Sequence, residues 1–278
     1  MKGVFPMKIT TVWAAYFSAT DTTKKVVTTI AQRLAQQAGA ELKTFDFTPA
    51  PVRQEPKSFG EGDLVVFGTP VYAGRVPNLL IKYVSSVQGN GAYAVPVVCY
   101  GNRSFDDGLM ELCLTLEGNG FTTLGAAAFS CQHSFSQIQN AGRPDVSDLT
   151  IASGFADQVW RKGASDGPIS AKVKGNNPVG PYYTPRDREG NPLNILKVKV
   201  STNAEACTHC GLCAKECPLG SIDHEDETIV SGPCMKCNRC VKLCPTKAKF
   251  FDAPNFIIHK EDLEERFSWP RKSPDLYI

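Results

Sequence analysis

The sequence predicts an α/β protein in which a doubly wound parallel sheet of five strands, in the order 2-1-3-4-5, is joined to a small cysteine-rich α+β module. Two observations predict this architecture. Apolar segments typical of buried strands alternate with amphipathic helical segments in the first part of the chain, and a cysteine pattern is repeated between positions 207 and 245. We therefore divide the 278 residues into a sheet domain (1–162), a linker (163–196), a cysteine module (197–253) and a C-terminal tail (254–278).

Each element of the sheet domain follows from its residue pattern. Runs rich in β-branched and aromatic residues predict strands at residues 9–17, 41–47, 63–67, 94–100 and 121–129. Apolar residues at helical spacing predict helices at residues 23–38, 77–87, 107–117 and 148–160, with Ser147 as the cap of the last. In the tail, we expect a short helix at residues 261–267, with Trp269 and Tyr277 as anchors on the body. The linker is rich in Gly, Pro and Asn, and Tyr182 and Tyr183 suggest that it docks.

The loop after the first strand has the composition of an anion site. In doubly wound sheets, ligands bind beyond the carboxyl ends of the strands. This loop runs directly into a helix N-terminus, where unpaired N–H groups and the helix dipole favour a negative charge, and hydroxyl side chains add donors. The glycine fingerprint of dinucleotide sites and the P-loop lysine are both absent. The loop comprises Ser18, Ala19, Thr20, Asp21, Thr22 and Thr23, and its expected donors are the hydroxyl groups of Ser18, Thr20, Thr22 and Thr23.

Two further loops leave the same edge of the predicted sheet. The loop after the third strand is irregular because of its Gly and Pro residues, and its tyrosine can lie flat on a ring system or pack in the protein. It comprises Thr69, Pro70, Val71, Tyr72, Ala73 and Gly74. The loop after the fourth strand contributes Tyr100, Gly101, Asn102 and Arg103. Arg103 could stabilise a reduced, anionic ring or pair with Asp106. Cys131 and His133 follow the fifth strand, and their role stays open.

The cysteine module contains the pattern C-x2-C-x2-C-x3-C-P twice, and each cysteine of the first run recurs 27 positions later, as Cys207 does at Cys234. This spacing is typical of [4Fe–4S] clusters, in which three close cysteines bind one cluster and the fourth ligates the other. We therefore assign two ligand sets: Cys207, Cys210, Cys213 and Cys244 for cluster 1, and Cys234, Cys237, Cys240 and Cys217 for cluster 2. Disulfides do not suit a chain of this length without a convincing export signal, and zinc ribbons space their cysteine pairs differently.

These motifs carry two resemblances. The cysteine module resembles the bacterial-type two-cluster ferredoxins. The hydroxyl-rich loop resembles the phosphate loop of flavodoxins, T/S-x-T-G-x-T, with Asp21 where that family has Gly. The resemblance implies that Ser18, Thr20 and Thr23 hold the phosphate of FMN, and that the other two loops flank its ring. As a whole, the chain resembles the fused flavodoxin–ferredoxin proteins of anaerobic microbes, the EFR1-family ferredoxins.

The expected function is a relay of electrons between FMN and two [4Fe–4S] clusters, serving soluble redox proteins. One alternative is a reductase with its own small-molecule substrate over the flavin, fed by the clusters, whose mark would be an open, partly polar pocket near Tyr72, Arg103 or His133. Another makes the clusters structural. The net charge of +2 argues against a nucleic-acid partner, and no run is apolar enough to span a bilayer. Eight cluster thiolates imply a reducing compartment, by default the cytoplasm. The oligomeric state stays open, with a homodimer among the options.

Overall fold

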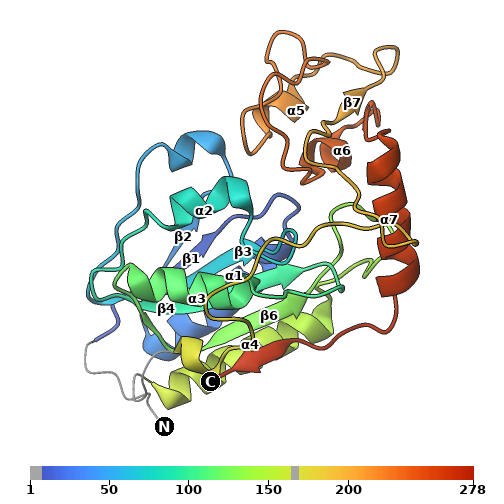
Figure 1. Cartoon of the computed structure of the whole chain (residues 1–278). Coiled ribbons are helices and arrows are strands. Elements are labelled where there is room, and N and C mark those ends of the chain that lie inside the picture. The colour runs from blue at the N-terminus through green and yellow to red at the C-terminus, as the bar shows by residue number, and fades with distance from the viewer. Residues whose placement is uncertain (1–7, 164–168) are drawn as a thin grey trace.

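A mostly parallel sheet forms the centre of the larger part of the protein. The computed structural model describes residues 8–163 and 169–278. Five parallel strands follow the order 2-1-3-4-6 and a sixth, antiparallel strand closes the edge (Figure 1). From one edge to the other they are β2 (Glu41–Asp46), β1 (Thr11–Tyr16), β3 (Asp63–Pro70), β4 (Tyr93–Tyr100), β6 (Ala126–Ser130) and β9 (Asp275–Tyr277). The parallel order is that of flavodoxins, so the predicted fold class is confirmed.

Helices cover both faces of this sheet because successive strand residues point to opposite sides. In β1, Val12 and Ala14 pack on one side, whereas Trp13 and Ala15 pack on the other. The first side is covered by α1 (Thr22–Ala38) and α4 (Val146–Lys162). The second side is covered by α2 (Asn78–Val84) and α3 (Gly108–Gly118), and its core contains buried aromatic rings such as Phe47 and Phe67. Two apolar layers therefore fix the sheet from both sides.

Several predicted boundaries differ from the structure. The predicted fifth strand is two pieces, β5 (Thr122–Thr123) and β6, and both pair with β4. A side chain at Gly125, between them, would meet Val159 and the backbone of Tyr277. Helix α4 is capped by Asp145, whose carboxylate accepts from the amide of Asp148 at 3.2 Å in a capping box. The predicted cap at Ser147 is therefore wrong.

The tail forms more structure than its sequence predicts. Helix α7 (Pro254–Phe267) begins seven residues before the expected residue 261, with Pro254 in its first turn, where the missing N–H costs nothing. Tyr277 lies in β9 and packs against the core, as expected of an anchor. Trp269 does not anchor the tail, since it is 77% exposed. Among the described residues, no helix is long and apolar enough to cross a bilayer.

The cysteine module is small and lies against one end of the sheet domain (Figure 1). Its antiparallel strands are β7 (Ser201–Thr202) and β8 (Lys249–Phe250), and its helices are α5 (Leu212–Lys215) and α6 (Arg239–Leu243). Met235 and Cys237 from this module are buried in the same apolar core as Phe17 and Phe47 of the sheet domain. The two parts of the chain therefore share a core.

Two short 3-10 helices complete the described elements. They are η1 (Ala50–Arg53), in the sheet domain, and η2 (Ile169–Lys172), at the start of the described linker.

The linker is held on the sheet domain by hydrogen bonds. The carboxylate of Asp107 accepts from the amide of Gly180 at 2.7 Å, and the hydroxyl of Tyr182 donates to the carbonyl of Val76 at 2.9 Å. The amide of Tyr183 donates to the carbonyl of Ala73 at 2.8 Å. The linker is therefore packed and forms part of the wall described below.

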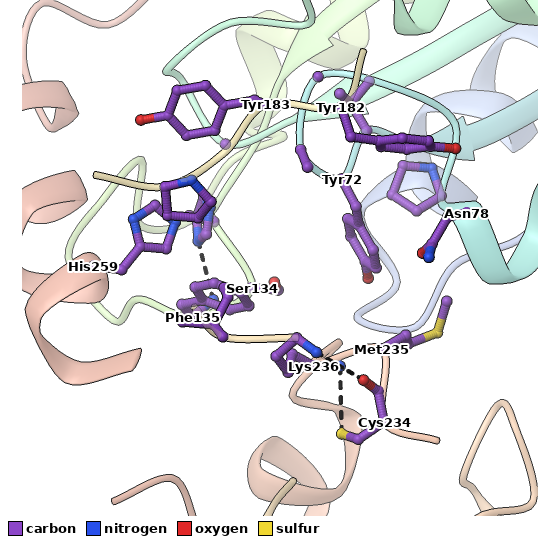
Figure 2. A pocket seen from close by; sticks show the side chains of 18 of the residues that line it. Tyr72, Asn78, Ser134, Phe135, Tyr182, Tyr183, Cys234, Met235, Lys236 and His259 are labelled. Carbon is purple, nitrogen blue, oxygen red and sulfur yellow. Dashed lines mark hydrogen bonds between the residues drawn. The ribbon is translucent and has the colours of Figure 1, made fainter. Parts of the chain in front are cut away.

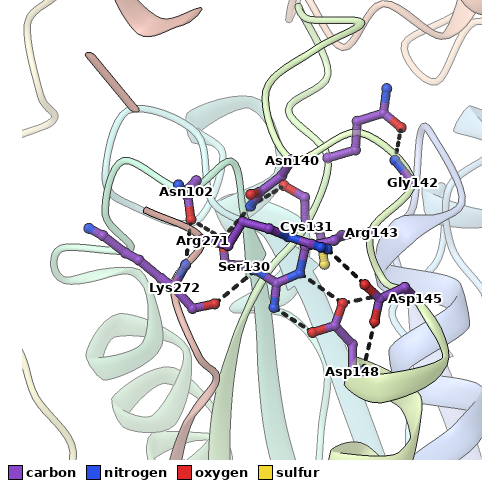
Figure 3. A network of polar contacts seen from close by, with 11 residues as sticks. Asn102, Ser130, Cys131, Asn140, Gly142, Arg143, Asp145, Asp148, Arg271 and Lys272 are labelled. Atoms are coloured by element: carbon purple, nitrogen blue, oxygen red, sulfur yellow. Dashed lines mark hydrogen bonds and ion pairs between the residues drawn. The ribbon is translucent and has the colours of Figure 1, made fainter. Parts of the chain in front are cut away.

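A buried ion pair joins the loop after β6 to helix α4, and its arginine also contacts the tail (Figure 3). The guanidinium of Arg143 binds the carboxylate of Asp148, and the two side chains are only 5% and 4% exposed. Arg143 also donates to the carbonyl of Lys272 at 2.8 Å. The neighbouring pair of Arg271 and Asp145 is much more exposed.

We predict that Arg143→Met lowers the free energy of unfolding by about 3–5 kcal/mol, because it leaves the charge of Asp148 buried without a partner. The matched control, Arg271→Met, should cost less than about 1 kcal/mol, because its ion pair is solvated. Anaerobic urea unfolding followed by circular dichroism measures both. Equal losses for the two variants would show that burial of the pair is unimportant.

Candidate cofactor site and cysteine clusters

A large cavity lies where the carboxyl-end loops of the sheet meet the linker, α7 and the cysteine module. Its volume is about 1200 Å3. The loops after β1, β3, β4 and β6 form one side, and residues 182–185 and 192–199 of the linker form another. Residues 231–236 of the cysteine module close it (Figure 2). The edge of the sheet at the carboxyl ends of its strands is therefore covered by segments that lie far away in the sequence.

The loop before α1 presents hydroxyl groups to this cavity. Thr20, Thr22 and Thr23 line it, together with Ala19. Helix α1 has no acidic residue in its first turn, and Asp21 adopts a left-handed φ of 62° without capping the helix with its side chain. Asp tolerates this conformation better than most residues do. The helix terminus can therefore offer amide donors to an anion.

Two residues of this predicted loop are not part of the cavity wall. Ser18 is buried, and its hydroxyl accepts from the amide of Lys24 at 3.0 Å. Its own amide donates to the hydroxyl of Thr48 at 2.8 Å. Asp21 also does not line the cavity. Ser18 thus positions the start of α1, and the three threonines are the hydroxyl-bearing residues of this loop that line the cavity.

The loop after β3 forms a tight turn along the cavity. Pro70, Val71, Tyr72, Ala73 and Gly74 all line it. The amides and carbonyls of Tyr72 and Arg75 bond to each other at 2.9 and 3.2 Å, and Ala73 and Gly74 adopt φ values of 50° and 79°. A side chain at Gly74 would meet the carboxylate of Asp106. Position 74 of this turn therefore requires glycine.

Thr69 and Tyr72 differ in their position relative to the cavity. Thr69 lies behind the wall, fully buried, and its hydroxyl is a buried polar atom without a hydrogen-bond partner. Burial raises the pKa of Tyr72 well above 10, and the neighbouring thiols of Cys237 and Cys234 raise it further. Tyr72 is therefore protonated and neutral, and it lines the cavity close to Cys234 and Cys237.

The loop after β4 is divided between the cavity and the tail. Tyr100, Gly101 and Arg103 line the cavity. Arg103 pairs with Asp106 and lies 4.1 Å from the ring centre of Tyr183. The predicted ion pair is present, and the guanidinium still faces the cavity.

Asn102 does not contact the cavity; it holds the tail instead. Its amide group donates to the carbonyls of Phe267 and Pro270 at 2.7 and 3.0 Å. Its side-chain oxygen accepts from the hydroxyl of Ser130 at 2.8 Å and from the amide of Lys272 at 3.0 Å (Figure 3). We therefore correct its predicted role from a ring contact to a structural one.

Cys131 and His133 do not form a nucleophile and base pair. Cys131 hydrogen-bonds to Cys99, and this bond together with burial raises the pKa of its thiol well above 9. The Nδ1 atom of His133 accepts from the amide of Phe135 at 3.1 Å. Burial lowers the pKa of His133 to about 3, so the imidazole is neutral at physiological pH. A thiol that stays protonated is a weak nucleophile.

Sequence reasoning missed part of the wall. His259 of α7, Lys236 and Met235 of the cysteine module, and Leu196 of the linker all line the cavity. These residues carry no local motif, and they come together only because α7 and the linker pack over the sheet edge. Tyr182 and Tyr183 were the one usable signal, since two adjacent tyrosines in a polar linker indicate docking.

The first predicted set of cysteines surrounds one small cavity. Cys207, Cys210, Cys213 and Cys244 all line it, although Cys244 follows the others by more than thirty residues in sequence. The cavity has a volume of about 20 Å3. Lys249 also lines it, and its buried ammonium donates to the hydroxyl of Thr202 at 2.7 Å and to the carbonyl of Glu227. A cation is thus fixed beside four thiols.

The second predicted set is also brought together. The pKa of Cys240 is raised by burial first, and then by the nearby thiols of Cys237, Cys234 and Cys217. The repeat extends to the hydrogen bonds on sulfur. The amide of Ser221 donates to the sulfur of Cys217 at 3.4 Å, and the amide of Ala248 donates to the sulfur of Cys244 at 3.2 Å. Cys217 and Cys244, the fourth cysteines of the two runs, therefore each accept a hydrogen bond from the amide four residues later.

The two sets differ in their surroundings. Cys234, Met235 and Lys236 line the large cavity, and Cys237 is buried in the shared core. In contrast, Cys210 is exposed at the far side of the module. One set is therefore an inner site beside the cavity, and the other is an outer site near solvent.

Residues 199–254 match the family model described as a 4Fe-4S dicluster domain. The C-terminal module is a 4Fe-4S dicluster domain. An uncharacterized ferredoxin of Methanocaldococcus jannaschii is 34% identical over 100 residues, covering 32% of this chain and 58% of that protein. NADH-quinone oxidoreductase subunit I 2 of Symbiobacterium thermophilum is 30% identical over 112 residues, covering 33% and 47%. The chain spans about half the length of these curated relatives.

Solved structures resemble the sheet domain. A flavodoxin from the domain Archaea has a TM-score of 0.38 at 13% identity, over 55% of this chain and 97% of that one. A flavodoxin of Streptococcus pneumoniae TIGR4 has a TM-score of 0.36 at 15% identity, over 59% and 99%. The dicluster domain, joined to a flavodoxin-like fold, supports an electron-transfer function.

The cysteine geometry predicts which pairs of substitutions act on one cluster. Cys244→Ala and Cys210→Ala should each damage the outer cluster, and the double variant should still retain about four irons. Cys244→Ala combined with Cys237→Ala should damage both clusters and leave few irons. Iron and sulfide analysis of anaerobically purified protein, with electron paramagnetic resonance, distinguishes the two. If the first pair lost both clusters and the second only one, the crossed assignment would be wrong.

Proposed function

We propose that the protein relays electrons between FMN in the large cavity and two [4Fe–4S] clusters in the dicluster domain. The observation that carries the proposal is that Cys234 and Lys236 line the same cavity as the three loops expected to bind the flavin. In this proposal, cluster 1 is held by Cys207, Cys210, Cys213 and Cys244, and cluster 2 by Cys234, Cys237, Cys240 and Cys217. The inner cluster and the flavin would share one wall.

The residues of the cavity fit FMN. Hydroxyl groups and an open helix terminus at Thr20, Thr22 and Thr23 suit a phosphate without a lysine. The turn at Ala73 and Gly74 supplies backbone groups to the part of the wall that also contains Tyr72 and Tyr100. When bound, FMN accepts two electrons and can release them one at a time.

The chain's own residues would insulate and orient this centre. Neutral Tyr72 lines the cavity beside the inner cysteines, and Met235 packs in the shared core. The sulfur of Cys234 accepts a hydrogen bond from the amide of Lys236 at 3.4 Å. Such bonds to cluster sulfur, together with burial, are the means by which a protein sets a cluster's potential.

The exposure of the outer site indicates where a partner docks. Cys210 is exposed, whereas the inner cysteines face the core and the cavity. Electrons would therefore be exchanged with a soluble redox protein at the outer cluster, and would pass through the inner cluster to the flavin. We place this activity in a reducing compartment such as the cytoplasm, because it needs eight thiolates.

One observation favours a second candidate, a flavin-dependent reductase with its own substrate. The cavity near Tyr72, Arg103 and His133 is large and partly polar, which is the feature expected of such an enzyme. A pure carrier needs only an exposed flavin edge. In this candidate the clusters supply electrons to a reaction in the cavity.

We predict that Thr20→Val weakens binding of FMN by about tenfold but leaves riboflavin almost unchanged, because only FMN carries the phosphate that the hydroxyl would bind. Fluorescence titration of flavin-depleted protein measures both constants. Thr28→Val, in the exposed part of α1, is the control. Equal weakening of the two flavins would show that the loop does not hold a phosphate.

The relay itself predicts intramolecular transfer. Anaerobically purified protein should contain about eight irons and one FMN. After rapid reduction of the clusters, the flavin should bleach at a rate independent of protein concentration, because both centres lie in one molecule. Stopped-flow spectroscopy over a tenfold range of protein concentration tests this. A rate proportional to concentration, or a protein that binds no flavin, would refute the relay.

A further inference from the structure

The large cavity has more room than one ligand needs. Pockets for single small molecules measure roughly 300–1,000 Å3, and this one measures about 1200 Å3. The flavin loops occupy the side formed by the sheet. The opposite side is built by the linker, by the loop after β6 and by α7, and none of these segments is among the expected flavin contacts. Arg103 comes from the loop after β4, one of the expected flavin loops, and its guanidinium stacks on Tyr183 of the linker on this side.

The charged side chains that line the large cavity are basic. Arg103, Lys197, Lys199 and Lys236 line the cavity, and no Asp or Glu is among the described residues that line it. Lys199 donates to the carbonyl of Val230 at 2.7 Å, and Lys236 to that of Cys234 at 2.9 Å, so carbonyl dipoles hold both ammonium groups without neutralising them. One guanidinium nitrogen of Arg103 donates to the carboxylate of Asp106, and the guanidinium has further N–H donors. An anion in this space meets attraction from several directions.

Two imidazoles stand on the same side. Because His133 accepts at Nδ1 from the amide of Phe135, its ring proton lies on Nε2, where it is a donor. His259 is only 6% exposed, and its Nδ1 atom has no hydrogen-bond partner among the described residues. Figure 2 shows His259, Ser134 and Phe135 grouped on one side of the cavity. A buried imidazole without a partner at Nδ1 is costly unless a ligand or water restores its hydrogen bonding.

Aromatic side chains complete this region. The ring of Tyr183 carries the guanidinium of Arg103 on one face, and Phe135 packs edge-on against His133 at 4.8 Å between ring centres. Flat rings beside a fixed guanidinium suit a planar body that bears a carboxylate. Arg binds a carboxylate through two parallel hydrogen bonds, which also sets the orientation of the bound molecule.

We propose that Arg103, His133, His259 and Tyr183 form a second ligand site, for a small aromatic or otherwise planar carboxylate, on the side of the cavity away from the sheet. The inference deepens the proposed function, and it rests on that function only in assigning the rest of the cavity to FMN. The site would let the protein hold a small anionic substrate in the same cavity as the flavin.

Calorimetric titration of the full chain, purified anaerobically with its cofactors, tests the site with two probes. trans-Cinnamate carries the carboxylate, and cinnamyl alcohol has the same skeleton without the charge. We expect cinnamate to bind at least tenfold more tightly than the alcohol. Arg103→Gln should weaken cinnamate at least tenfold, and His259→Phe, which keeps the ring but removes its nitrogens, should weaken it several-fold. Arg188→Gln is the control, since Arg188 lies on the same linker and does not line the cavity.

Iron content and a circular dichroism spectrum equal to those of the wild type show that each variant is folded. No binding of cinnamate, equal binding of the two probes, or equal losses in Arg103→Gln and Arg188→Gln would each overturn the inference. Competition between cinnamate and added FMN in flavin-depleted protein would also overturn it, while leaving the relay intact. Selective cinnamate binding by a protein that takes up no FMN would refute the relay and keep the second site.

Discussion

Burial of the inner cysteine loop against the sheet is the contact on which the arrangement of the protein depends. Met235 and Cys237 lie in the same apolar core as Phe17 and Phe47, and Leu219 packs against it. Polar contacts reinforce this packing at its rim, because Arg239 donates to the carbonyl of Ala19 at 2.8 Å and Arg53 to that of Pro218. Ala19 belongs to the loop that precedes α1. The inner cysteines are therefore fixed relative to the loop before α1, and the cavity that both line has a defined shape.

The packed linker follows from this contact. Ordering a long Gly- and Pro-rich segment costs conformational entropy, and a tether alone would not require it. Here Asp107 binds Gly180, and the hydroxyl of Tyr182 binds Val76, so the segment is held along its path to the dicluster domain. The ordered linker closes one side of the cavity and contributes Tyr183 and Lys199 to its wall. A rigid connection keeps the centres at a constant separation, whereas a flexible one would only raise their effective concentration.

Sequence reasoning succeeded where the determinant is local and failed where it is not. Hydrophobic periodicity predicted the parallel strands, and cysteine spacing predicted the dicluster domain, because both signals lie within short windows. Asn102 was assigned to the flavin because it follows a strand, but four hydrogen bonds to Ser130 and to the tail use its amide. The antiparallel strand β9 and the exposed Trp269 depend on how the tail crosses the sheet edge, and residues 268–278 carry no pattern that reveals it.

The two halves of the cysteine repeat provide equivalent ligands, so any difference between the sites must come from segments outside the repeat. Cys217 and Cys244 each accept a hydrogen bond from the amide four residues later, and the sulfur chemistry is therefore matched. The surroundings of the two sites, however, differ. Buried Lys249 lies beside the outer set, whereas Tyr72 and the apolar core enclose the inner set. Charge, burial and solvent access all shift the potential of an iron–sulfur cluster. A duplicated motif packed on one side against a sheet thus acquires an inner and an outer site, and in the proposed relay this asymmetry would give the electron path two distinct ends.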